Sequence, residues 1–188
     1  MATSICDDAR QLMCEKMAGN DASHDFAHVE RVRKMAMRIA QEEGVVDPKE
    51  LEIIELAAWL HDYGDHKYSD NPNAPREWLE AQGYADAELV QSIIDGVSYS
   101  KNEKDGPQEP ASQLHAIVQD ADRLDAIGCV GIARVFAFGA GPFVQTLKHF
   151  DDKLFKLCDL LKTDYAKSIG DERHQQLREF YDSLCEQL

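Results

Sequence analysis

Apolar residues recur at helical spacing along the first third of the chain. Between residues 26 and 43 they are separated by steps of three, one and four, and the pattern stops at Gly44. Such spacing places them on one face of an amphipathic helix that ends at the glycine. A shorter pattern of the same kind covers residues 5–17. A third helix is expected over residues 47–61, because an aspartate followed by proline is a typical helix start.

The middle of the chain continues as shorter predicted helices joined by polar segments. One helix is expected after Pro75 and another after Asp86. The second carries apolar residues that should face the core: Leu89, Val90, Ile93, Ile94 and Val97. Residues 99–111 are polar and contain glycine and proline, which predicts a loop. A further helix is expected to begin near Ser112 and to pass through Asp122.

Glycines divide the predicted helices of the last third. Gly128 and Gly131 interrupt the apolar pattern. Two amphipathic helices are expected at roughly 150–168 and 172–187, separated by Gly170. No run of alternating β-branched residues is long enough to predict a strand. The sequence therefore predicts an all-α fold, a compact helical bundle.

Length and charge narrow the class of protein. A chain of 188 residues suits one domain. The 35 acidic and 20 basic residues give a net charge of -15, and a field of that sign repels nucleic acid backbones and anionic lipid surfaces. We therefore expect neither a nucleic acid partner nor a membrane. A small anionic substrate remains compatible, because a bound cation and a few basic side chains can reverse the potential locally.

Cysteine usage and the N-terminal sequence indicate the cellular compartment. The chain has five cysteines and no C-x-x-C, which is neither a disulfide framework nor a zinc finger. Reduced thiols in the core are therefore expected. The first residues lack a basic and then apolar signal segment, and no apolar run is long enough to span a membrane. These features predict a cytoplasmic protein.

Three segments contain polar residues in places where a helical protein is usually apolar. They are residues 24–28 (HDFAH), 61–67 (HDYGDHK) and 120–125 (DADRLD). His61 and Asp62 end an apolar helix and should lie near the core, where an acid needs a partner or a metal ion. Two imidazoles and two carboxylates can hold a divalent ion and leave positions for water and substrate.

Residue type alone does not select the ligands. A single histidine in a helix is more often a core or surface residue than a metal ligand. Composition gives no reason to prefer the histidines of these segments over His115, His149 or His174.

Taken together, HDFAH at 24–28, LAAWLHD at 56–62 and DADRLD at 120–125 resemble the HD-domain phosphohydrolase superfamily. The similarity covers about residues 20–187 and is closest to a branch of small stand-alone proteins that includes bacterial nucleotide pyrophosphohydrolases. The resemblance to this branch also extends to residues 93–101, 120–134, 149–157, 162–167 and 172–174. The resemblance implies a single HD domain over residues 1–188. Its core motif region lies at about 20–130, and C-terminal helices at about 145–187 pack on it.

The resemblance also implies a metal site. Its ligands would be His28, His61, Asp62 and Asp122, holding one divalent ion. Mn²⁺ is the expected ion, with Ni²⁺, Co²⁺, Fe²⁺ and Mg²⁺ as alternatives. Two-metal HD phosphodiesterases carry additional histidines between the HD pair and the last aspartate. Here that interval offers only two, outside any second-metal motif, so a mononuclear site is expected.

Catalytic and substrate-binding roles are less specified by the sequence. Asp65 follows the HD pair by one helical turn and could transfer a proton, or it could be a surface carboxylate. Lys67 could contact phosphate in catalysis and binding, or it could be a solvated lysine. His24 could transfer a proton or cap the helix that follows. Asp125 and Lys101 are further candidates for substrate binding.

The resemblance implies hydrolysis of nucleoside or deoxynucleoside triphosphates to a monophosphate and pyrophosphate. Alternatives are a nucleoside 5'-monophosphatase, another phosphomonoesterase or phosphodiesterase, and a regulatory module that binds nucleotides without turnover. Guanosine tetraphosphate hydrolases carry Glu-Asp shortly after the HD pair, whereas this chain has Gly-Asp-His at 64–66. The expected partner is a small nucleotide, and the expected assembly is a monomer or homodimer.

Overall fold

The computed structural model describes residues 4–18, 25–65, 71–98, 109–138 and 143–188. Within these ranges the regular elements are helices and no strand occurs, so the predicted all-α class is confirmed. The α-helices are α1 (Ile5–Lys16), α2 (Phe26–Glu42), α3 (Pro48–Leu60), α4 (Ala74–Ala81), α5 (Ala87–Asp95), α7 (Gln113–Asp125), α8 (Gly128–Phe138), α9 (Phe143–His149), α10 (Phe155–Leu157) and α11 (Asp164–Gln187). A π-helical turn (Phe150–Leu154) precedes α10, and a 3-10 turn (Cys158–Leu160) follows it.

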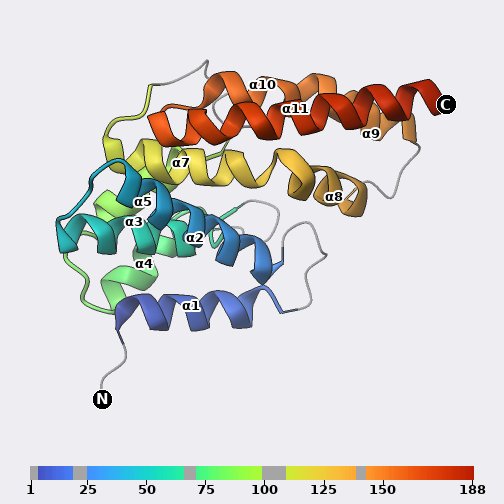
Figure 1. Ribbon diagram of the computed structural model, residues 1–188. Helices are drawn as coiled ribbons and strands as arrows, with labels where there is room; N and C mark the ends of the chain where they lie inside the picture. Colours follow the sequence, from blue (N-terminus) through green and yellow to red (C-terminus); the bar gives the residue numbers. More distant parts are fainter. Residues whose placement is uncertain (1–3, 19–24, 66–70, 99–108, 139–142) are drawn as a thin grey trace.

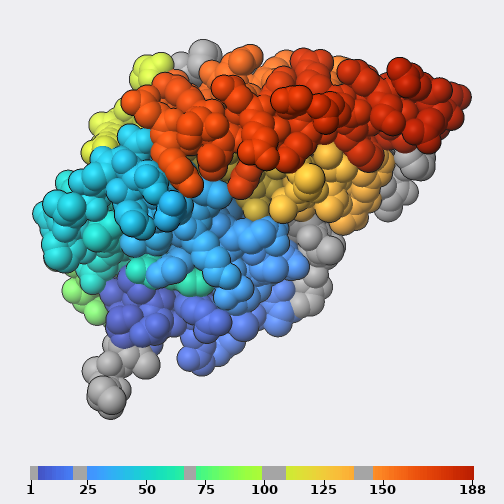
Figure 2. Space-filling model, viewed as in Figure 1, coloured from blue at the N-terminus to red at the C-terminus, as the bar shows by residue number. Residues whose placement is uncertain are grey.

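Helices α2, α3 and α7 form the centre of the molecule. Helix α2 packs against α3 and α7, and α3 also contacts α1, α5 and α7. Figure 1 shows α1 covering this group on one side, while α10 and α11 cover it on the other. The space-filling view shows the C-terminal end of α11 projecting beyond the rest of the molecule (Figure 2).

The C-terminal half of helix α3 is largely buried because α3 packs against four other helices. Its buried residues are Ile53, Ile54, Leu56, Ala57, Ala58, Trp59 and Leu60. Burying each large apolar side chain stabilises the fold by roughly 1.5–3 kcal/mol. The two residues that follow Leu60 are thereby placed inside the protein, at the end of a helix that packing holds rigidly.

Side chains at the helix ends explain where several elements begin. The carboxylate of Asp25 accepts a hydrogen bond from the backbone N–H of His28 at 3.0 Å, and the Ser112 hydroxyl accepts one from the N–H of His115 at 3.2 Å. Each satisfies a backbone donor that the first turn of a helix leaves without a partner. At the other end of α2, Gly44 adopts φ 75°, a conformation that glycine tolerates best.

The interruption expected at Gly128 is confirmed, because α7 ends at Asp125 and α8 begins at Gly128 with φ 71°. Gly131 and Gly170, by contrast, lie inside helices. Gly170 is within α11, and a Cβ there would lie 2.4 Å from Cδ1 of Leu161. Gly131 is within α8, where a Cβ would lie 2.2 Å from the carbonyl oxygen of Ala126. These glycines allow close approach of neighbouring segments, so the predicted division at Gly170 is wrong. The chain instead leaves the helical conformation at Leu161, whose ψ is 141°.

Two predictions about the core are also wrong. Leu89 is 41% exposed because the inward face of α5 is formed by residues 87, 90, 91, 93 and 94. The cysteines were expected in the core, but Cys6 and Cys158 are only partly buried and the other three are exposed. All five are free thiols, as expected. Cys14, for example, lies off the face of α1 that buries Ala9 and Met13.

Candidate metal centre

Three central helices bring a pair of histidines and a carboxylate to one point. His28 lies in the first turn of α2, His61 directly follows α3, and Asp122 lies in the last turn of α7. Each offers one donor atom, and these three atoms lie within 4.8 Å of one another. The Nε2 atoms of the two histidines are 3.3 Å apart.

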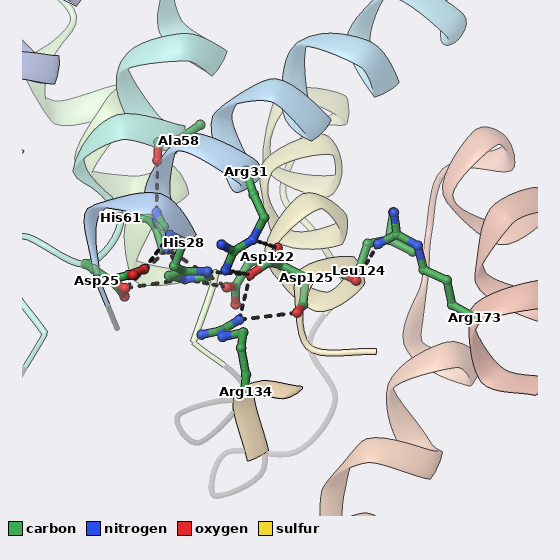
Figure 3. Close-up of polar contacts among 11 residues, drawn as sticks. Asp25, His28, Arg31, Ala58, His61, Asp122, Leu124, Asp125, Arg134 and Arg173 are labelled. Atoms are coloured by element: carbon green, nitrogen blue, oxygen red, sulfur yellow. Dashed lines mark hydrogen bonds and ion pairs between the residues drawn. The ribbon is translucent and has the colours of Figure 1, made fainter. Parts of the chain in front are cut away.

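Asp62 joins the same group from its position beside His61. Its Oδ2 atom lies 3.5 Å from Nε2 of His28 and 3.5 Å from Nε2 of His61. Oδ1 of Asp122 lies 3.5 Å and 3.9 Å from the same two nitrogens. Both imidazoles are buried, whereas the carboxylates keep some contact with solvent. The four residues that the sequence predicts as ligands therefore converge on one point (Figure 3 labels three of them).

The hydrogen bonds of the two rings make this cluster suitable for a cation. Nδ1 of His61 lies 2.9 Å from the carbonyl oxygen of Ala58, and Nδ1 of His28 lies 2.7 Å from Oδ2 of Asp125. Because both oxygens can only accept, each Nδ1 carries the hydrogen and each Nε2 presents a lone pair to the cluster. Two facing lone pairs flanked by carboxylates repel one another unless a cation lies among them. The donor set fits a first-row divalent ion.

The charges around His61 lead to the same conclusion. Burial opposes the protonated form of this imidazole, but Asp62 and Asp122 outweigh the effect and raise its pKa above the ordinary value of 6.5. The cluster therefore attracts positive charge, which a proton or a metal ion can supply.

Comparison with known proteins identifies this arrangement. Residues 25–127, which include all four residues of the cluster, match the model of the HD domain family. The chain belongs to the HD domain family. YpgQ of Bacillus subtilis is 35% identical to it over 181 residues, which cover 89% of this chain and 86% of YpgQ.

Several solved structures share the fold over nearly the whole chain. A structure from Lactobacillus plantarum matches with a TM-score of 0.82 and 32% identity, covering 100% of this chain and 98% of the other. The structure of YpgQ in complex with ADP matches with a TM-score of 0.78 and 31% identity, covering 97% of each chain. A third, an HD-superfamily hydrolase from Bacillus thuringiensis, has a TM-score of 0.73 and 31% identity, covering 97% and 95%.

Asp125 lies behind His28, on the side of the ring away from the other HD residues. Arg31 donates to both of its carboxylate oxygens, from Nε at 2.7 Å and from a terminal nitrogen at 3.0 Å. Arg134 donates to Oδ2 at 2.8 Å (Figure 3). Burial raises the pKa of Asp125, but the hydrogen bonds from His28 and Arg31 dominate and hold it well below its usual range. Asp125 is thus an ionised acceptor that orients His28.

Sequence reasoning assigned no role to Arg31 and Arg134. Arg31 stands three residues after His28, so helical spacing alone places the two on one face of α2. Arg134 stands nine residues after Asp125 in the next helix, and no local rule connects them. Arg134 is the last residue of the segment 120–134, one of the segments that carry the family resemblance. Its place in that segment is the signal by which the sequence could have pointed to it.

The other polar residues of the DADRLD segment attach the HD centre to the C-terminal helices. Asp120 is fully buried and accepts hydrogen bonds from the backbone N–H groups of Lys162 and Thr163, at 2.9 Å and 2.7 Å. It also accepts from the Thr163 hydroxyl at 2.9 Å. Arg123 donates to the carbonyl oxygen of Leu160, and Arg173 donates to that of Leu124. The end of α7 is therefore fixed from both sides.

Of the remaining predicted site residues, the structure describes only Asp65. Asp65 lies in the turn after the HD pair, partly buried, and its N–H donates to the carbonyl oxygen of Asp62 at 3.2 Å. His24, Lys67 and Lys101 lie outside the described residues.

Of the helices in the described ranges, none combines the length and the apolar character needed to cross a bilayer.

Proposed function

We propose that this HD protein is a divalent-metal-dependent phosphohydrolase that cleaves nucleoside or deoxynucleoside triphosphates to a monophosphate and pyrophosphate. The observation that carries the proposal is the meeting of two Nε2 lone pairs and two carboxylates at the junction of α2, α3 and α7. The complex of YpgQ with ADP supports a nucleotide as the ligand class, because that relative shares the fold over 97% of this chain.

His28, His61, Asp62 and Asp122 would hold one divalent ion, with Mn²⁺ as the proposed metal. When bound, such an ion lowers the pKa of a coordinated water molecule and polarises a phosphoryl oxygen. The protein orients both imidazoles through the Ala58 carbonyl and the Asp125 carboxylate, so that each Nε2 faces the site. Nearly full burial of the rings limits competition from solvent.

The remaining steps are assigned to the segment after the HD pair. Asp65 stands one turn beyond Asp62 and would accept the proton of the attacking water. Lys67 would hold a phosphate oxygen, and Lys101 and His24 stay candidates for substrate contact and proton transfer. For Asp125 we propose a positioning role in place of substrate binding, because its carboxylate already accepts from His28 and two arginines.

A nucleotide panel tests this function. The purified protein is incubated separately with ribo- and deoxyribonucleoside triphosphates and monophosphates in the presence of Mn²⁺, and pyrophosphate and orthophosphate are measured separately. Pyrophosphate with an equimolar monophosphate supports the proposal, and a chelator should abolish its release. Orthophosphate from nucleoside monophosphates would instead identify a monophosphatase. Nucleotide binding without any phosphate release would identify a regulatory module.

A further inference from the structure

Two arginines share one carboxylate beside the HD centre. Arg31 and Arg134 both donate to Asp125, so the three side chains together carry one positive charge. Asp125 is buried, and the side chain of Arg134 is 17% exposed. On the other side of His28 this positive charge adjoins Asp62 and Asp122, two carboxylates of the predicted ligand set.

Neutralising Asp125 does not require Arg134, which donates from one terminal nitrogen to Oδ2 at 2.8 Å and to the backbone carbonyl oxygen of Asp125 at 3.3 Å. Arg31 alone places one nitrogen on each carboxylate oxygen, at 2.7 Å and 3.0 Å, in the bidentate geometry that stabilises such a pair. A second guanidinium group on the same carboxylate adds like-charge repulsion. An anion bound beside Arg134 would compensate that cost.

The position of Arg134 relates it to the HD centre. Its terminal nitrogen donates to the Oδ2 atom that also contacts Nδ1 of His28, so guanidinium and imidazole share one oxygen. In Figure 3 the guanidinium group lies across the cluster from the Ala58 carbonyl, with His28 and Asp122 between them.

We propose that Arg134 binds a phosphate group of the substrate next to the HD centre, with its guanidinium group held in place by Asp125. This inference rests on the proposed function and adds a phosphate-binding residue to it. In the metal-free protein, the charges of Asp62 and Asp122 offset that of Arg134. A divalent ion neutralises those two carboxylates, so the positive charge of Arg134 then acts on the phosphate. Metal and nucleotide binding are therefore coupled through this residue.

The test measures binding, separately from turnover. Mn²⁺ affinity and the affinities of ADP and inorganic pyrophosphate at saturating Mn²⁺ are determined by calorimetry for wild type, Arg134→Gln and Arg31→Gln. Loss of one charge-assisted contact predicts that Arg134→Gln weakens both phosphate ligands by about 10- to 100-fold, with a much smaller change in Mn²⁺ affinity. Arg31→Gln should have the opposite pattern, because Arg31 acts through Asp125 and His28.

Two results would overturn the assignment. Arg134→Gln could bind ADP and pyrophosphate as wild type does, or it could lose Mn²⁺ and phosphate affinity in parallel, as a residue that only orients Asp125 would. Arg134→Lys keeps the charge without the planar fork and should show an intermediate loss, which provides a second reading if the Gln variant does not fold. Metal-dependent binding through Arg134 without triphosphate hydrolysis by wild type would refute the proposed function alone.

Discussion

Nδ1 of His28 lies 2.7 Å from Oδ2 of Asp125, although the two residues are 97 positions apart in the chain. The contact fixes which ring nitrogen carries the hydrogen and aims the other at His61, Asp62 and Asp122. Because two arginines hold the carboxylate in place, the ring cannot turn without losing this contact. The geometry of the HD centre thus depends on a residue that is not one of its ligands.

Asp125→Asn should weaken metal binding without abolishing it. The amide is a poorer acceptor for His28 and leaves two guanidinium groups without their counter-charge, so we expect Mn²⁺ affinity to fall by about 10- to 100-fold. Isothermal titration calorimetry measures the change. Asp152→Asn, at a side chain that is 61% exposed on the π-helical turn, is the matched control. An affinity within twofold of wild type in Asp125→Asn would refute the positioning role.

Removing a ligand should have a stronger effect. His61→Ala and Asp122→Ala are expected to lose retained Mn²⁺ and hydrolysis together, while the far-UV circular dichroism spectrum stays helical. His149→Ala, at a histidine outside the cluster, should behave as wild type. Metal content after gel filtration and the rate of pyrophosphate release are the two measurements. Full activity in either ligand variant would show that the site is assigned wrongly.

The raised pKa of His61 predicts opposite effects of pH on the two forms of the protein. Without metal, the protonated ring stabilises the fold at pH values below 6.5, and this contribution is lost as the pH rises through the higher pKa of the folded state. Metal binding requires the neutral ring, so stabilisation by Mn²⁺ should grow over the same range. Thermal unfolding between pH 5.5 and 8, with and without Mn²⁺, measures both trends. A metal-induced shift in Tm that stays constant with pH would contradict this account.

Asp120→Asn should separate stability from metal binding. Its carboxylate fixes the start of α11 through Lys162 and Thr163, and a lost hydrogen bond to a charged group costs about 1.5–3 kcal/mol. Chemical denaturation should show that loss, while Mn²⁺ affinity changes little. The neighbouring variant Asp122→Asn should show the reverse, with metal affinity lost and stability kept. Equal unfolding free energies for Asp120→Asn and wild type would argue against the anchoring role.

Asp65→Asn tests the proposed proton acceptor. The substitution keeps the size of the side chain and removes its charge, so kcat should fall by about 100-fold or more while Mn²⁺ stays bound. Initial rates at saturating substrate, together with metal content, distinguish this from a loss of the metal site. Wild-type turnover in the variant would show that Asp65 takes no part in the chemistry.

The sequence by itself determined the local structure of this protein. Apolar spacing and end residues such as Asp47 and Ser112 placed the helices up to α7 to within a few residues, because capping and amphipathicity depend on neighbours within one or two turns. The same reasoning placed His61 and Asp62 at the buried end of α3. The expectation for Gly170 failed, because its role depends on the approach of Leu161 from the segment before α11.

Only the tertiary structure decided which polar residues meet. The motifs named His28, His61, Asp62 and Asp122, but the packing of α2 against α3 and α7 sets the distances among them. The same packing turned Asp125 toward His28 and brought Arg134 to it from the next helix, which no spacing rule indicates. Hydrogen bonds and charges act over a few ångströms in space regardless of separation along the chain. Contacts between distant segments are therefore fixed only when the helices have packed.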